Sequence, residues 1–266
     1  MEYQKEKYSN PIEALKTIDK SYNQLQGKFI LLGTEYANMI TGTLGNEVFY
    51  LFRDNILRRL SAALYHYDIL AKLNISGVPT LYDPRKSPPD GFHVGLHQSY
   101  VFDSIIFHLI SGFDYFASFV KYFTYGHKDD RRELWSKLIK RMHTIDKLNQ
   151  SALALELKAI NKEFVQILVD YRAKLIHNES DFPKFLQKTK IFNGETFIYV
   201  TAPKSLHKKF KKLLPPIDSC SINEIALWLL DSSLDAFYRL LDATSIFFEE
   251  NRVTLPGDEI IRFDKS

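Results

Sequence analysis

The sequence has little cysteine, glycine or proline, and it has no long uninterrupted run of apolar residues. Its single cysteine, Cys220, excludes an intramolecular disulfide, so we do not expect a fold that depends on an oxidising compartment. Eleven glycines and ten prolines in 266 residues exclude a collagenous or low-complexity chain. Residues 1–14 are charged and lack the apolar stretch of a signal peptide.

A membrane span is not expected either. The most apolar stretch, residues 101–120, is interrupted by Asp103, His108 and Asp114, whereas a span needs about 20 consecutive apolar residues. The sequence contains no phosphate-binding loop, dinucleotide fingerprint or kinase motif. It therefore predicts a soluble, cytoplasmic protein with no membrane partner and no cofactor.

What the sequence does have is apolar residues at helical spacing along most of its length. Helices are expected over about residues 11–26, 34–73, 99–125, 131–142, 151–177 and 221–251. The stretch 34–73 is one helix, or two with a break marked by Gly42 and Gly45. The last of these opens with Ser221 and Glu224 at the spacing of a capping box. Prolines and glycines in residues 74–98 predict the main loop. The predicted fold is all-α, with an N-terminal helical extension and loop at 1–98 and a helical bundle at 99–253.

One basic segment, at about residues 184–212, is predicted to interrupt this bundle. Asn193-Gly194 lies between two β-prone runs and predicts a small β-hairpin insertion. The segment holds eight lysines and one acidic residue, and aromatic residues alternate with the lysines. This pattern suits RNA, because lysines contact phosphates and aromatic rings stack on bases, although a solvated helix face has the same composition. The candidate RNA contacts here are Lys204, Lys208, Lys209, Lys211 and Lys212.

The stretch DYRAKLIHN, at the end of the helix predicted for residues 151–177, combines an arginine with a histidine. Arg172 and His177 are five residues apart, a rise of about 7.5 Å along a helix. Guanidinium groups bind phosphate oxygens, and imidazole gains or loses a proton near pH 7. Such a pair can cleave RNA without a metal if the imidazole moves the proton of a ribose 2′-OH and the guanidinium stabilises the phosphorane.

This stretch resembles the R-x4–6-H motif of the HEPN family, with four residues between Arg172 and His177. The resemblance implies a bundle of four or five helices and a metal-independent endoribonuclease that works as a homodimer. Many such enzymes act in toxin–antitoxin or antiviral systems, so RNA and an antitoxin are the implied partners. It also implies that Arg172 and His177 are catalytic, and we assign an assisting catalytic role to Asn178 and an RNA contact to Lys174.

Two alternatives remain open at this point. The residue after the motif arginine is often polar, and here it is Ala173, which favours a non-catalytic HEPN-like module that binds RNA, a nucleotide or a protein. Cationic side chains also stabilise the C-terminus of any helix, so the Arg172–His177 pair can be a helix end in a purely structural protein.

Two further pairs of polar residues have a spacing that can place them together. His93 and His97 can share a zinc ion if they lie on a helix, but Gly95 between them predicts a loop. Asp103 and Asp114 return to nearly the same face of one helix. Either carboxylate is a candidate for orienting Arg172 or His177, and the alternative is a structural hydrogen bond.

Overall fold

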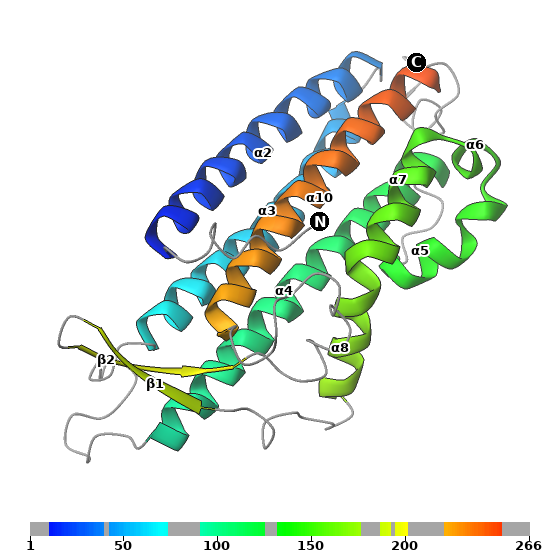
Figure 1. The fold of residues 1–266 in the computed structure, drawn as a ribbon. Helices are drawn as coiled ribbons and strands as arrows, with labels where there is room; N and C mark the ends of the chain where they lie inside the picture. Colours follow the sequence, from blue (N-terminus) through cyan, green and yellow to red (C-terminus); the bar gives the residue numbers. More distant parts are fainter. Residues whose placement is uncertain are drawn as a thin grey trace. The chain divides into compact units, whose positions relative to one another are not determined.

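The computed structural model describes residues 11–39, 43–73, 91–125, 132–176, 187–192, 195–201 and 221–251 (Figure 1). The long helices are α2 (Pro11–Met39), α3 (Thr43–Leu73), α4 (Gly91–Tyr125) and α10 (Ile222–Glu250). The shorter helical segments are α5 (Trp135–Arg141), η2 (Met142–Thr144), α6 (Asp146–Asn149), α7 (Ala152–Ile160), the π-helical η3 (Asn161–Val165) and α8 (Gln166–Ile176).

The prediction of an all-α fold is confirmed, since helices make up most of the described chain. Two short strands, β1 (Gln187–Phe192) and β2 (Glu195–Val200), pair antiparallel with Phe192 opposite Glu195. Within the described residues, no helix combines the length and the apolar character that crossing a membrane requires.

Three predicted helix boundaries were wrong, one of them the start of the second helix, which was predicted near residue 34 and lies at Thr43. Residues 91–98, predicted as loop, form the first turns of α4, where the hydroxyl of Ser99 donates to the carbonyl of Gly95 at 2.9 Å. The first helix, predicted to end near residue 26, continues to Met39. A glycine destabilises a helix by only about 1 kcal/mol relative to alanine, so tertiary packing can continue a helix through it.

The described chain divides into two compact units that do not follow chain order. Unit 1 contains residues 1–17, 61–108 and 167–231, and unit 2 contains residues 18–60, 109–166 and 232–266. The divisions fall inside α2, α3, α4 and α10 and at the start of α8. Each unit therefore takes segments from early, middle and late parts of the sequence.

Unit 2 is built around aromatic side chains, supplied by helices that lie side by side in Figure 1. Phe113 of α4 stacks on Phe237 of α10 with ring centroids 4.6 Å apart. Phe49 of α3 packs between Tyr36 of α2 and Phe119 of α4, at 5.4 and 5.2 Å. Such pairs stabilise a core by about 0.5–1.5 kcal/mol each beyond the burial of their area.

The glycines of α2 provide a matched test of this packing. A Cβ on Gly33 would lie 2.9 Å from Cε1 of Phe49, whereas a Cβ on Gly27 would meet nothing within 4 Å. Phe49 is buried between Tyr36 and Phe119, so its displacement is costly. We therefore expect Gly33→Ala to lower the free energy of unfolding by about 1–3 kcal/mol. Gly27→Ala is expected to raise it by about 0.5–1 kcal/mol. Urea unfolding of the two variants measures the difference, and equal effects would contradict the close approach.

In unit 1, the buried side chain of Gln98 on α4 connects this helix to α3 and β2. Nε2 of Gln98 donates to the carbonyl of Leu73 at 3.1 Å, and its Oε1 accepts from the backbone N–H of Val200 at 3.1 Å. The predicted capping box is confirmed, because the backbone N–H of Ser221 donates to Glu224 at 2.8 Å and that of Glu224 donates to Oγ of Ser221 at 3.2 Å. The start of α10 is thereby fixed within this unit.

Candidate functional site

The motif arginine lies near the end of α8. Arg172 and Lys174 are half-buried, and Ala173 between them is exposed. The description of α8 ends at Ile176, so the predicted catalytic residues His177 and Asn178 lie outside the described residues. The structure thus locates the arginine of the motif on a helix, as predicted from the periodicity, and leaves the imidazole as a prediction.

A hydrogen bond within unit 1 attaches this end of α8 to α4. The hydroxyl of the buried Tyr171, next to Arg172, donates to Oδ1 of Asp103 at 3.2 Å. Asp103 was a candidate for orienting Arg172 or His177 from the facing helix. Its carboxylate holds the residue that precedes the motif arginine, so it restrains the helical turn on which Arg172 lies.

Asp114, the other candidate carboxylate, makes a structural hydrogen bond in unit 2. Its Oδ1 accepts from the backbone N–H of Trp135, the first residue of α5, at 2.9 Å. The N-cap of α5 is Leu134, whose side chain cannot accept a hydrogen bond. The buried carboxylate of Asp114 therefore satisfies an N–H group that a helix start leaves without a partner.

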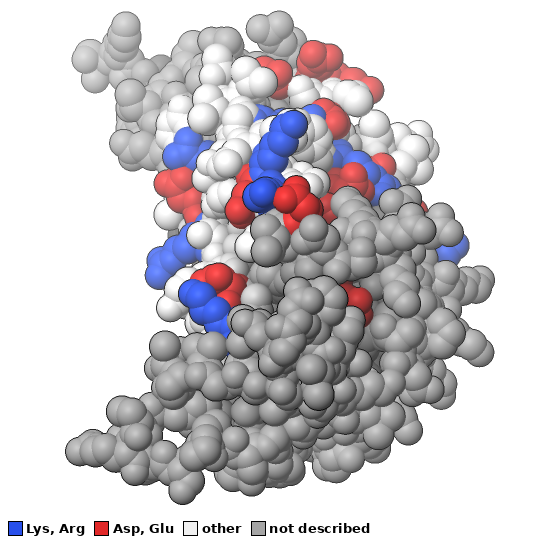
Figure 2. Space-filling model, turned by 60° about the vertical axis from the view of Figure 1, so that its left-hand side comes forward, with Lys and Arg blue, Asp and Glu red and all other residues white. Residues whose placement is uncertain are grey.

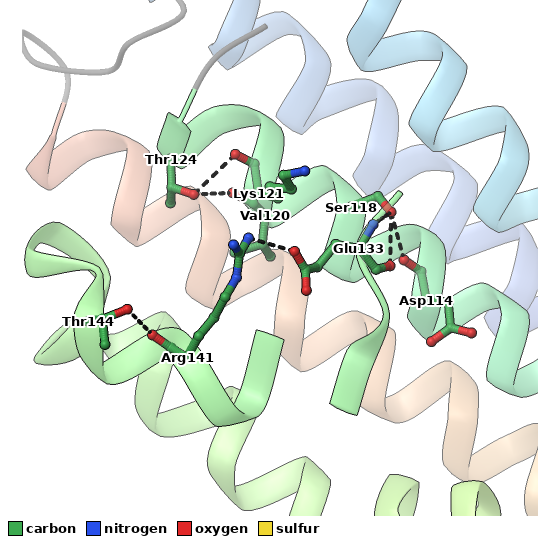
Figure 3. Close-up of polar contacts among 8 residues, drawn as sticks. All are labelled: Asp114, Ser118, Val120, Lys121, Thr124, Glu133, Arg141 and Thr144. Atoms are coloured by element: carbon green, nitrogen blue, oxygen red, sulfur yellow. Dashed lines mark hydrogen bonds and ion pairs between the residues drawn. The ribbon is translucent and has the colours of Figure 1, made fainter. Parts of the chain in front are cut away.

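Two further contacts hold the residues before α5 against α4. The hydroxyl of Ser118 accepts from the backbone N–H of Glu133 and donates to its carbonyl, both at 3.1 Å. The Glu133 side chain then pairs with the Arg141 guanidinium at 2.6 Å, and Figure 3 shows the two groups pointing toward each other. Because Glu133 is buried, losing Arg141 would leave its charge without this partner. Arg141 is half-buried, so the cost should be below the roughly 3–5 kcal/mol of a fully buried pair.

Removing the Asp114 carboxylate tests this network. We expect Asp114→Ala to lower the free energy of unfolding by about 1–3 kcal/mol, because it leaves a buried N–H without its acceptor. Asp19→Ala, at an exposed position of α2 in the same unit, is expected to change it by less than about 0.5 kcal/mol. Chemical unfolding followed by circular dichroism compares the two, and equal stabilities would show that the contact to Trp135 contributes nothing.

A second charged cluster in unit 2 surrounds Arg239 of α10. Its guanidinium pairs with Glu156 of α7 at 2.5 Å and with Glu163 of η3 at 3.4 Å. Burial lowers the pKa of Arg239, but the two carboxylates outweigh burial and raise the pKa above its ordinary value. Arg239 is therefore a cation that is already paired with carboxylates of the same unit.

Unit 1 also contains a tyrosine that the sequence did not single out. Tyr67 of α3 is fully buried, and burial raises its pKa well above the ordinary value. The charge of Glu224 raises this pKa further, because a negative neighbour opposes ionisation. The Tyr67 hydroxyl therefore stays protonated at neutral pH and is not a candidate base.

The possible zinc pair, which was not predicted to bind metal, and the predicted RNA contacts are mostly untested by the described residues. His97 lies on α4, and His93 is on the same helix four residues earlier, although the side chain of His93 is outside the described part. No group of three or more potential metal ligands occurs in the ranges that the structure describes. Of the lysines predicted to bind RNA, five lie outside those ranges, namely Lys204, Lys208, Lys209, Lys211 and Lys212.

The charge on one face of the described chain is mixed. In Figure 2 the coloured lysines and arginines lie beside aspartates and glutamates, without a continuous patch of one sign among them.

Scans of family models, of curated proteins and of solved structures found no match to this chain. Any function must therefore be inferred from its own residues.

Proposed function

We propose that this chain is a metal-independent endoribonuclease of the HEPN type. The observation that carries the proposal is the position of Arg172, half-buried on the last described turns of α8 with His177 just beyond them in the sequence. The hydrogen bond from Tyr171 to Asp103 supports it, because it restrains the turn that presents Arg172. A fixed guanidinium stabilises a developing phosphorane better than a mobile one, since less reorganisation is needed.

The proposed reaction is attack of a ribose 2′-OH on the neighbouring phosphodiester. His177 takes the 2′-OH proton, and an imidazole returns a proton to the departing 5′ oxygen. Arg172 donates hydrogen bonds to the phosphorane oxygens, while Asn178 and Lys174 contact the RNA. Two copies of the chain would bring two motifs to one site, and the lysines of residues 204–212 would bind the RNA backbone. Such an enzyme would act in the cytoplasm, with an antitoxin as a partner in a defence or toxin–antitoxin system.

Cleavage of RNA in the presence of EDTA tests the proposal. The purified protein should cut a labelled single-stranded RNA, and Arg172→Ala should cut it at least about a hundredfold more slowly. If the parent protein leaves the RNA intact, or the variant cuts equally fast, the proposal is wrong.

The second candidate is a non-catalytic module of the same kind that binds RNA, a nucleotide or a protein. The exposed Ala173 favours it, because a polar group that often follows the motif arginine is missing. RNA binding without cleavage, unchanged by His177→Ala, would select this candidate. Such binding should weaken steeply as salt is added.

A further inference from the structure

Two arginines converge on one tyrosine in unit 2. The guanidinium carbon of Arg132 lies 4.4 Å from the ring centroid of Tyr115, and that of Arg59 lies 5.8 Å from the same centroid. Both distances are within the range of a cation–π contact. We call Arg59, Tyr115 and Arg132 the arginine–tyrosine cluster.

The backbone beside Arg132 is held firmly. The next residue, Glu133, exchanges two hydrogen bonds with Ser118, and Trp135 donates to Asp114. Tyr115 follows Asp114 directly on α4. The backbone next to Arg132 is therefore held against α4, and its guanidinium lies over the ring of Tyr115. A restrained backbone lowers the conformational entropy that binding through this residue costs.

Arg132 differs from Arg239 and Arg141 of unit 2 in its partners. Arg239 and Arg141 are paired with carboxylates. Arg132 is exposed, and among the described residues no carboxylate forms an ion pair with it. A guanidinium stacked on a ring keeps its N–H edge directed outward, where it can donate two hydrogen bonds to a phosphate.

We propose that the arginine–tyrosine cluster binds the phosphate backbone of single-stranded RNA. The two guanidinium carbons are at most about 10 Å apart, because both distances are measured to one centroid, so a single strand can reach both. The outer face of the exposed Arg132 guanidinium can also stack on an unpaired base. The inference rests on the proposed function only in taking RNA as the ligand, since backbone binding does not require cleavage.

Binding of a 2′-O-methyl RNA oligonucleotide, followed by fluorescence anisotropy, tests this cluster. The probe has no 2′-OH, so it cannot be cleaved by the proposed reaction. We expect Arg132→Gln and Arg59→Gln each to weaken binding by about three- to tenfold and to lower the slope of log K against log salt by about 1. Arg132→Lys should restore the slope and only part of the affinity, because lysine keeps the charge without the planar fork.

Lys158→Gln is the matched control. Lys158 is an exposed cation of α7 in the same unit, and its removal should change affinity by less than about twofold. Circular dichroism should show the parent helix content in every variant. If Arg132→Gln and Arg59→Gln bind like Lys158→Gln, or if the parent protein does not bind the probe, the inference is wrong. If the parent protein binds the probe normally but does not cleave natural RNA, the proposed nuclease function is wrong and the RNA-binding inference stands.

Discussion

Replacing His177 by alanine is expected to abolish RNA cleavage. A general acid or base contributes about 10²–10⁴-fold to a rate, so the cleavage rate constant should fall by that factor. Arg172→Ala should reduce it by about 10²–10³-fold, because the phosphorane loses charge-assisted hydrogen bonds. Single-turnover cleavage of labelled RNA, with EDTA in the buffer, measures both effects.

Two controls separate these effects from damage to the fold. His143→Ala removes an exposed histidine of η2, and it should cut RNA at the parent rate. Asp103→Asn keeps an acceptor for Tyr171, so the turn that carries Arg172 should stay in place. If His143→Ala loses as much activity as His177→Ala, the loss does not report the motif.

The second large effect is expected from Phe113→Ala in the core of unit 2. Phe113 is fully buried, stacks on Phe237 at 4.6 Å and meets the edge of Trp135 at 5.2 Å. Removing the ring leaves a cavity between α4, α5 and α10, so the free energy of unfolding should fall by about 3–5 kcal/mol. Urea unfolding followed by circular dichroism measures this change.

Phe107→Ala is the matched control on the same helix. Phe107 is 38% exposed, so its removal should cost less than about 1.5 kcal/mol. Equal losses in the two variants would mean that burial of the Phe113 ring does not dominate its contribution. A steeper or shallower dependence on urea in Phe113→Ala would instead mean that the compactness of the folded or unfolded state has changed, or that unfolding is not two-state.

Boundaries were the least predictable feature of the helices. The apolar periodicity placed α4 correctly over residues 99–125, but glycines and prolines led to a loop at 91–98 where α4 begins. Gly33 shows why composition alone does not predict where a helix ends. It lies inside α2, where its lack of a Cβ leaves room for the ring of Phe49. Whether a glycine breaks a helix or packs inside one depends on the neighbouring helix, which a single sequence does not show.

The candidate site shows the same limit. Asp103 and Asp114 occupy one face by spacing, yet Asp103 binds Tyr171 while Asp114 caps α5. The arginine–tyrosine cluster was missed from the sequence, although the doublets at residues 58–59 and 131–132 were a signal. Nothing in their spacing indicates that both would meet Tyr115.

The sequence by itself determined the helical class, the capping box of α10 and the helical position of Arg172. These three features depend on local information, namely the spacing of apolar residues and hydrogen bonds between residues close in the chain. Only the tertiary structure decided which carboxylate satisfies which donor, and which arginines have a carboxylate partner. The physical reason is that such partners are distant in the chain, so their contacts depend on how helices pack rather than on local spacing.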